Sequence, residues 1–232
     1  MQAASPQQKV AENIWVLRFP LSLLGTRLGR TVTVIRLDSG ELVIHSTAPF
    51  APADVTAIKA LGRPAWLVEA TLFHDTYAEA GRAALPNIPY LVPDGFPVVR
   101  GGTSPLHTPP HAWAGDLAML PLDGMPKVRE HVFLHLPSRT LIVADLVFNF
   151  GPQATAWTRW FFRWPAGIRE YPGMSRLFRA CVRDRAAFTR SVSRMMQWDF
   201  DRLIVGHGDI IESDAKPRLA AALATHGFSE VK

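Results

Sequence analysis

Four ionisable residues lie at or just past the ends of predicted buried strands. His74 and Asp75 follow one such strand, Asp145 ends a second, and His207 follows a third between Gly206 and Gly208. Open α/β sheets build their sites beyond the ends of their strands. Imidazole and carboxylate groups are the usual ligands of zinc, iron and manganese in proteins. The sequence therefore marks His74, Asp75, Asp145 and His207 as candidate metal ligands.

Each of these residues also has a purely structural interpretation. An aspartate at a strand end, such as Asp145, is often a helix cap or a turn residue. The glycines around His207 make a tight turn whether or not the imidazole has a function, and Asp75 could cap a helix that starts at Tyr77. No single one of these residues is a strong indication of a metal site. Their order and spacing along the chain, taken together, favour the metal interpretation.

The elements that must position these residues follow from the hydrophobic pattern. Apolar and β-branched runs predict strands, and apolar repeats at helical spacing predict helices. We expect a hairpin of strands 31–37 and 41–45 around the turn at 38–40, after a first strand at 13–19. Further strands are predicted at 64–69, 90–92, 117–122, 131–135, 141–145 and 202–206, and helices at 52–62, at 154–198 with breaks near Pro165 and Pro172, and at 215–226.

This order of elements predicts sheets that are covered by helices on their outer faces, as in a layered α/β sandwich. Residues 1–232 are expected to form a single domain, because no long linker divides them, with residues 154–198 as a helical insert rich in arginine and tryptophan.

The order resembles the metallo-β-lactamase superfamily, whose fold is a four-layer αββα sandwich. The resemblance covers residues 13–225, and Leu-Ile-Val-Ala-Asp145 and Leu-Ile-Val-Gly-His207-Gly carry it. The superfamily holds its metals through a His-x-His-x-Asp-His motif, a histidine in a Gly-His-Thr segment, an aspartate after a strand and a histidine in a Gly-His turn. The resemblance implies this fold and a metal-dependent hydrolase chemistry.

The first motif and the Gly-His-Thr segment depart from the superfamily pattern. With Asp75 in the place of the motif aspartate, its three histidine positions become Thr71, Phe73 and Thr76. The segment 124–126, where the Gly-His-Thr histidine is expected, has no histidine. The resemblance therefore implies a degenerate site that cannot hold two metals in the superfamily's way.

Asp75, Asp145 and His207 remain of the superfamily's ligand set. Three ligands can hold one divalent metal with an open position, and two carboxylates with one imidazole favour iron or manganese over zinc. His74 could take part if the loop adopts another register. The Phe73-His74 pair and the segment 137–143 resemble a ligand-poor branch of the superfamily, which implies the fold and no established activity.

Composition limits the class of protein further. Of the 232 residues, 48% are hydrophobic and one is a cysteine, which excludes a disordered chain and a disulfide scaffold. No apolar run approaches the roughly 18 residues of a membrane span, and no signal-peptide core stands near Met1. We expect a soluble, cytoplasmic protein.

The segment 157–164 holds three tryptophans, two phenylalanines and two arginines. Packing in the core or against a second copy in a homodimer is the favoured interpretation. The alternatives are a lid over an apolar small-molecule ligand and a peripheral membrane contact through 157–164. Nine arginines between Arg159 and Arg194 face only two acidic residues, and the favoured interpretation is a solvated helical face, with no nucleic-acid partner expected.

Three hypotheses for function follow. The first is a superfamily-like protein with a degenerate metal site and absent or weak activity. The second is a mono-metal hydrolase of an ester, thioester, lactone or phosphoester, with Asp75 as a candidate catalytic base and zinc, iron or manganese as candidate metals. The third is an interaction protein that works through its basic aromatic segment.

Overall fold

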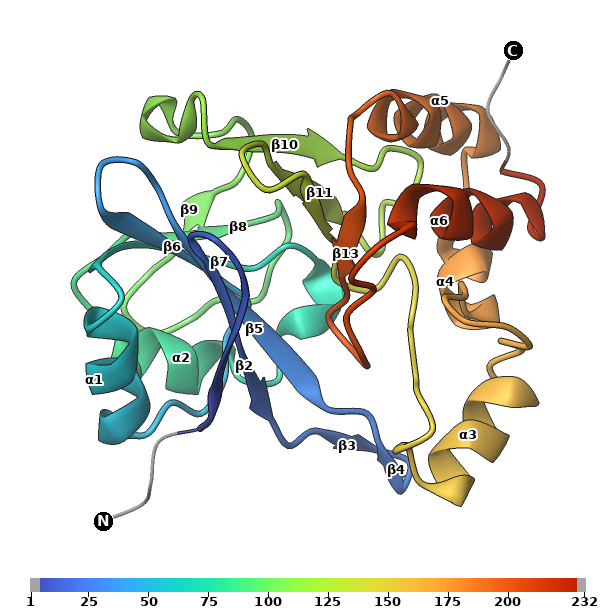
Figure 1. The fold of residues 1–232 in the computed structure, drawn as a ribbon, viewed down its shortest axis with the longest axis horizontal. Helices are drawn as coiled ribbons and strands as arrows, with labels where there is room; N and C mark the ends of the chain where they lie inside the picture. The colour runs from blue at the N-terminus through green and yellow to red at the C-terminus, as the bar shows by residue number, and fades with distance from the viewer. Residues whose placement is uncertain (1–4, 229–232) are drawn as a thin grey trace.

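The structure of the protein is a computed structural model that describes residues 5–228, and it stacks two β-sheets between two groups of helices (Figure 1). Within those residues the first sheet has seven strands in the order β1-β2-β5-β6-β7-β8-β9. Its strands are β1 (Gln7–Ala11), β2 (Ile14–Phe19), β5 (Arg30–Arg36), β6 (Glu41–His45), β7 (Arg63–Val68), β8 (Tyr90–Val92) and β9 (Ser104–Pro105).

The second sheet has four strands in the order β10-β11-β12-β13 within the same range. They are β10 (Leu117–Pro121), β11 (His131–His135), β12 (Thr140–Ile142) and β13 (Arg202–Ile204). β12 and β13 run parallel, so the chain between them crosses over through helices. A separate small hairpin of β3 (Ser22–Leu23) and β4 (Thr26–Arg27) projects from the first sheet between β2 and β5.

Helices cover the outer face of each sheet (Figure 1). α1 (Pro52–Lys59) and α2 (Ala78–Ala84) lie on the first sheet; α4 (Arg176–Cys181), α5 (Arg185–Met196) and α6 (Ala215–Ala224) lie on the second. α3 (Ala156–Arg163) packs against the hairpin β3–β4 instead. No helix in the described range is long and apolar enough to cross a membrane.

The two-residue alternation along the strands builds these layers. In β6, Val43 points into the core between the sheets, while Leu42 and Ile44 point to the core under α1 and α2. In β11, Phe133 joins the core between the sheets and Leu134 joins the core under α4, α5 and α6. Because successive side chains of a strand face opposite ways, each sheet buries both of its faces.

The predicted αββα sandwich is confirmed by these layers. The strands 41–45, 90–92 and 131–135 have the predicted bounds, and the helical insert is interrupted around Pro165 and Pro172 as expected, between α3 and α4. A second break, at residues 182–184 between α4 and α5, was not predicted. β1, the hairpin β3–β4 and α2 were not predicted.

Candidate metal centre

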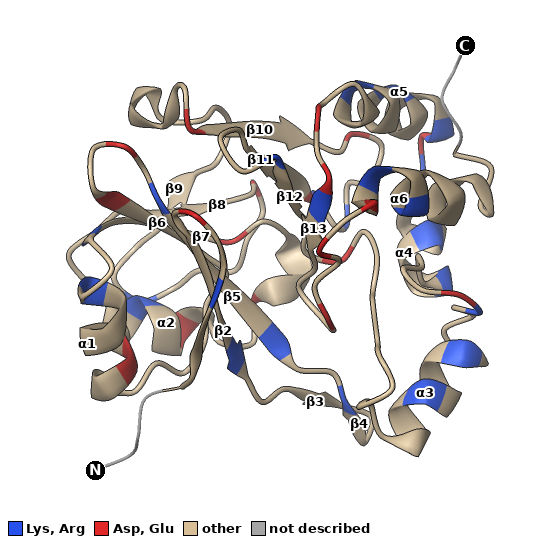
Figure 2. Cartoon of the chain, in the orientation of Figure 1, with Lys and Arg blue, Asp and Glu red and all other residues tan. Residues whose placement is uncertain are grey.

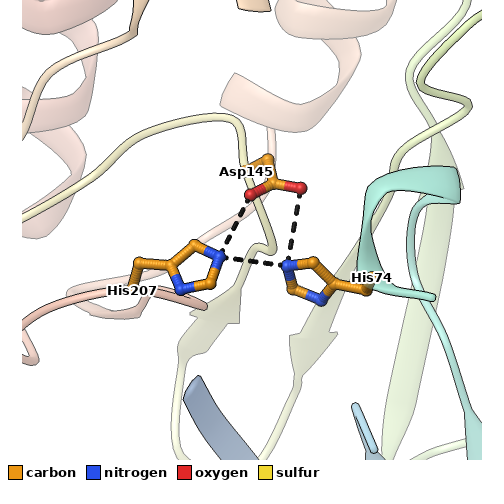
Figure 3. A group of neighbouring side chains, drawn as sticks. All are labelled: His74, Asp145 and His207. Atoms are coloured by element: carbon orange, nitrogen blue, oxygen red, sulfur yellow. Dashed lines mark hydrogen bonds and ion pairs between the residues drawn. The ribbon is translucent and has the colours of Figure 1, made fainter. Parts of the chain in front are cut away.

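Three side chains from distant parts of the chain meet at one end of the two sheets (Figure 3). His74 Nε2 lies 3.3 Å from His207 Nε2 and 3.4 Å from Asp145 Oδ2. His207 Nε2 lies 3.3 Å from Asp145 Oδ1. All three residues are buried. Among the residues that the structure describes, this is the one group of three His, Cys, Asp or Glu side chains placed to hold a metal ion.

A single 3₁₀ turn, Leu72–His74, aims His74 into the centre. The Thr71 hydroxyl accepts a hydrogen bond from the Phe73 backbone N–H and donates one to the Val128 carbonyl. This cap fixes the turn, so that His74 is buried while Phe73 points outward.

Asp145 follows β12 and is positioned by the buried carboxylate of Glu130. Glu130 Oε1 accepts from the backbone N–H groups of Ala144, at 2.9 Å, and Leu146, at 3.2 Å. Its Oε2 accepts from the Asp145 N–H at 3.1 Å. Burial and the nearby Asp145 charge raise the pKa of Glu130 to about 8, against the pull of the three N–H groups.

His207 follows β13 in a turn that only glycine on each side allows. A Cβ on Gly206 would lie 2.5 Å from the Ala144 carbonyl oxygen. Gly208 has a φ of +110°, and a Cβ there would lie 2.2 Å from the Asn149 carbonyl oxygen. These close approaches explain the Gly-His-Gly pattern that the sequence analysis singled out.

The outer nitrogen of His207 carries its hydrogen. His207 Nδ1 lies 2.5 Å from the Gly29 carbonyl oxygen, which can only accept. The ring also stacks on Phe148, with ring centroids 5.6 Å apart. A neutral imidazole has one N–H, so His207 Nε2 presents a lone pair to the centre.

The outer nitrogen of His74 faces acceptors as well. Nδ1 lies 3.6 Å from the Glu69 carboxylate and 3.3 Å from the Ser46 hydroxyl oxygen. That hydroxyl donates its own hydrogen to Glu69 and accepts one from the Arg30 guanidinium. These partners place the hydrogen of the neutral ring on Nδ1, so His74 Nε2 also presents a lone pair.

The lone pairs of His74 Nε2 and His207 Nε2 and the carboxylate of Asp145 therefore converge on one point. Asp145 Oδ2 is buried and has no hydrogen-bond partner among the described residues. Only a cation between them makes this arrangement favourable, either a proton on one ring or a metal ion. The separations of 3.3, 3.3 and 3.4 Å match the roughly 3.4 Å between ligand atoms of a tetrahedral zinc site. The residues present fit one divalent metal.

The charges of these groups agree with a cation-binding centre. Burial by itself raises the pKa of Asp145, but the positive charge of a protonated His74 and the adjacent His207 ring hold that pKa well below its usual range. Burial lowers the pKa of His207. Burial and Arg30 also act to lower the pKa of His74, yet Asp145 and Glu69 raise it overall. Without a metal, a proton on His74 is the cation that the centre favours.

A mainly apolar cavity of about 570 Å³ opens beside Asp145 and His207. Most of its walls come from the hairpin β3–β4, from Phe73, from Phe148 and from the segment 161–178. Arg30 also lines it, and its Nε is buried without a hydrogen-bond partner among the described residues. Few polar groups at the base of an apolar cavity are typical of a small-molecule site.

The structure brings together three of the four candidate ligands. His74 takes the place that the sequence analysis gave to Asp75, so the donor set has two imidazoles and one carboxylate. Asp75 is exposed and lines the cavity away from the centre. Zinc and iron both use such a set of two histidines and one carboxylate.

Sequence analysis missed Glu69 and Glu130, the two buried acids behind the ligands. Glu69 also accepts hydrogen bonds from the backbone N–H of Thr47, at 2.7 Å, and from its hydroxyl. The available signal was a charged residue next to an apolar strand. Glu69 ends the run Trp66-Leu-Val, and Glu130 precedes the run that begins at His131. A charge at such a place is buried only when it has partners.

Comparison with known proteins found no matching family model and no matching curated protein. Solved structures do match over nearly the whole chain. A metallo-β-lactamase from Pontibacter korlensis is 16% identical, with 96% of this chain and 98% of that chain covered and a TM-score of 0.63. FIM-1 from Pseudomonas aeruginosa, in its mono-zinc form, is 14% identical, with 97% of each chain covered and a TM-score of 0.60.

A metallo-β-lactamase from Erythrobacter litoralis, with β-mercaptoethanol in the active site, is 13% identical. The match covers 94% of this chain and 96% of that chain, with a TM-score of 0.64. At these identities the likeness concerns the path of the backbone and not the chemistry of the site.

Proposed function

Because this chain has the metallo-β-lactamase fold, we propose that it holds one divalent metal through His74, Asp145 and His207 and acts as a hydrolase. The observation that supports this proposal is the convergence of His74 Nε2, His207 Nε2 and the Asp145 carboxylate, with the outer nitrogen of each ring committed to its own acceptor. The substrate class is an ester, thioester, lactone or phosphoester whose apolar part occupies the adjacent cavity.

A bound divalent metal supplies Lewis acidity and makes a water molecule nucleophilic at neutral pH. The chain's own residues supply the rest. Arg30, a buried cation that lines the cavity, supplies positive charge that stabilises negative charge developing on the substrate. Asp75, at the cavity wall and in contact with solvent, is the candidate base that takes up a proton. The apolar walls exclude water from the reacting bond.

A second candidate function is a ligand-binding protein without metal. The observation that favours it is that a proton on His74 also satisfies the three converging groups. In that case the cavity binds an apolar ligand and the Asp145–His74 pair closes its base. This second function corresponds to the first hypothesis of the sequence analysis, a degenerate metal site with absent or weak activity.

Elemental analysis of the untagged protein, purified without added metal or chelator, separates the two. The proposal expects about one zinc or iron per chain, a ratio that follows from the three-ligand set. His207→Ala and Asp145→Ala should lose the metal, while His111→Ala, which removes an exposed imidazole outside the centre, should keep it.

A metal-free wild-type protein that shows no thermal shift with zinc, iron or manganese would refute the metal site and leave the ligand-binding function. If metal binds, we expect hydrolysis of apolar ester and thioester substrates, lost together with the metal in His207→Ala. Full activity in the metal-free variant would contradict the assignment of the centre.

A further inference from the structure

Six large apolar side chains stand exposed around the cavity mouth, and we call them the apolar rim. Leu24 exposes 70% of its surface, Leu177 67% and Trp164 55%. The rim consists of Leu23 and Leu24 from the hairpin β3–β4, Trp157 and Trp160 from α3, Trp164 directly after α3, and Leu177 from α4. Contiguous exposed apolar surface on a folded protein marks an interaction site.

The rim is held together as one surface. The Trp157 indole N–H donates to the Leu24 carbonyl at 3.2 Å. The Arg27 backbone N–H donates to the Thr158 hydroxyl at 3.0 Å. Trp157 and Trp160 stack with ring centroids 4.9 Å apart. The hairpin and α3 therefore present their apolar side chains in a fixed relation to each other.

The hairpin tip keeps a leucine where the backbone disfavours one. Leu24 has a φ of 50° and Gly25 a φ of 76°, so both central residues of the turn are left-handed. Asparagine and glycine are the residues that such a turn prefers, and a leucine there carries backbone strain. A strained leucine whose side chain is mostly exposed gains nothing from the core, which points to a contact outside the chain.

Positive charge surrounds the rim without being neutralised. Residues 154–182 hold five arginines and one glutamate, and Figure 2 shows basic positions along α3 and α4. Arg159 and Arg176 donate to backbone carbonyls, and Arg163 lies over the Trp164 ring. None of the five has an ion pair with a carboxylate in the described part of the chain.

The rim and the cavity are continuous. Leu23, Leu24 and Leu177 are both rim residues and cavity-lining residues, and the buried His207 and Asp145 line the same cavity. An apolar chain that enters between the hairpin and α4 would therefore occupy the cavity that Asp145 and His207 line.

We propose that the apolar rim docks onto an anionic lipid bilayer, with the cavity mouth facing the membrane. Tryptophans beside arginines are the residues that settle at a membrane interface, where indole rings enter the headgroup region and arginines bind anionic lipids. A symmetric dimer through this surface would place like-charged arginines against each other, which costs free energy. The proposal goes beyond the hydrolase function and does not depend on the metal.

Flotation with lipid vesicles tests the proposal. We expect the protein to float with vesicles of phosphatidylcholine and phosphatidylglycerol, to bind vesicles of phosphatidylcholine alone about tenfold more weakly, and to dissociate at high salt. His207→Ala should bind as the wild type does. This separates a failure of the membrane proposal from a failure of the metal centre.

Two variants reduce the apolar surface of the rim and should leave the fold intact. Leu24→Asn puts a preferred residue into the left-handed turn, so stability should hold or rise while vesicle binding falls severalfold. Trp160→Ser with Trp164→Ser should lower binding about tenfold or more, because two indole rings no longer reach the lipid. Val98→Ser is the control, since Val98 is 98% exposed in the loop between β8 and β9, outside the apolar rim.

Equal flotation of wild type and both rim variants would overturn the proposal, as would absence of flotation with anionic vesicles. Concentration-dependent dimerisation in sedimentation that Leu24→Asn abolishes, without any vesicle binding, would also overturn it and assign the rim to a second copy.

Discussion

At the scale of single residues, the buried acids Glu69 and Glu130 determine where the ligands point. Glu130 binds three consecutive backbone N–H groups around Asp145, and Glu69 stands behind His74. Neither faces the cavity. Mutation of groups that orient a ligand through its other atoms typically lowers metal affinity about 10–100-fold.

Glu130→Gln should therefore weaken both the fold and the metal site. An amide nitrogen cannot accept, so at least one N–H at residues 144–146 loses its partner, at a cost of about 1–3 kcal/mol in the free energy of unfolding. Metal affinity should fall about tenfold or more because Asp145 is no longer fixed. Denaturant titration and a metal-competition assay measure the two effects.

Asp116→Asn is the matched control for Glu130→Gln. Asp116 is also a buried carboxylate that accepts a backbone N–H, from Asp38, but it lies outside the candidate centre. An asparagine oxygen can still accept the single N–H of Asp38, so stability should change little and metal affinity should stay unchanged. Equal losses of affinity in both variants would reduce Glu130 to a structural role.

His45 makes stability depend on pH. Its ring is buried against Phe133, and burial lowers the pKa of His45 to about 4. In the unfolded chain the pKa of His45 is near 6.5, so the unfolded state binds the proton at a higher pH than the folded state does. The contribution of the neutral His45 ring to the free energy of unfolding is therefore fully present above about pH 6.5 and is lost as the pH falls toward 4, by about 3 kcal/mol in total. His45→Leu should flatten the free energy of unfolding in this window. An unchanged slope would contradict this origin.

At the scale of elements, the turn after β13 depends on a close approach of backbones. A Cβ on Gly206 would also lie 3.1 Å from His74 Cε1, in addition to its clash with the Ala144 carbonyl. Gly206→Ala should lower the free energy of unfolding by about 1–3 kcal/mol. It should also lower metal affinity, because the added Cβ pushes the loop that carries His207 away from His74 and from the loop that carries Asp145.

Gly95→Ala distinguishes crowding from backbone strain. Gly95 has a φ of +80° and open space around its Cβ position, so alanine there adds only the left-handed strain of about 1 kcal/mol. Thermal unfolding of both variants, with metal titration, makes the comparison. If Gly206→Ala bound metal like Gly95→Ala, the close approach would have no role in the site.

The elements that sequence predicted well are those whose pattern reflects burial on both faces. Strands 41–45 and 131–135 are such runs, and their bounds agree. The hairpin β3–β4 was missed because its turn has leucine in place of the usual asparagine, and α2 was missed because alanine and glycine dominate its sequence and carry little apolar periodicity.

The candidate site was predicted in outline, and the register of one loop was not. Asp145 and His207 follow apolar strands, so their positions come from the strands themselves. His74 and Asp75 are neighbours, and only the 3₁₀ turn capped by Thr71 decides which of them faces inward. That choice depends on a contact with Val128, which is 57 residues away and absent from any local pattern.

At the scale of the whole molecule, the candidate centre joins the two sheets. His74 comes from the loop after β7 of the first sheet, whereas Asp145 and His207 follow β12 and β13 of the second. A ligand that binds only this folded arrangement stabilises it by mass action. A metal ion bound here would act as a cross-link between the halves of the sandwich.

Metal loading should consequently raise the melting temperature. At a free metal concentration one hundred times Kd, stabilisation is about 2.7 kcal/mol, or roughly 5–10 °C for a chain of this size. Calorimetry with and without chelator measures the shift, and Asp145→Ala should abolish it. A metal that binds without any thermal shift would lie elsewhere on the protein.

The stacked pair Trp157–Trp160 has an optical consequence. The ring centroids of Trp157 and Trp160 lie 4.9 Å apart on the apolar rim and both indoles are about half exposed, whereas Trp113 is fully buried. Transfer of the exposed indoles into lipid would shift the fluorescence emission to shorter wavelength, and separation of the pair would change the near-ultraviolet circular dichroism. Docking of the apolar rim would thus be detectable without an added label.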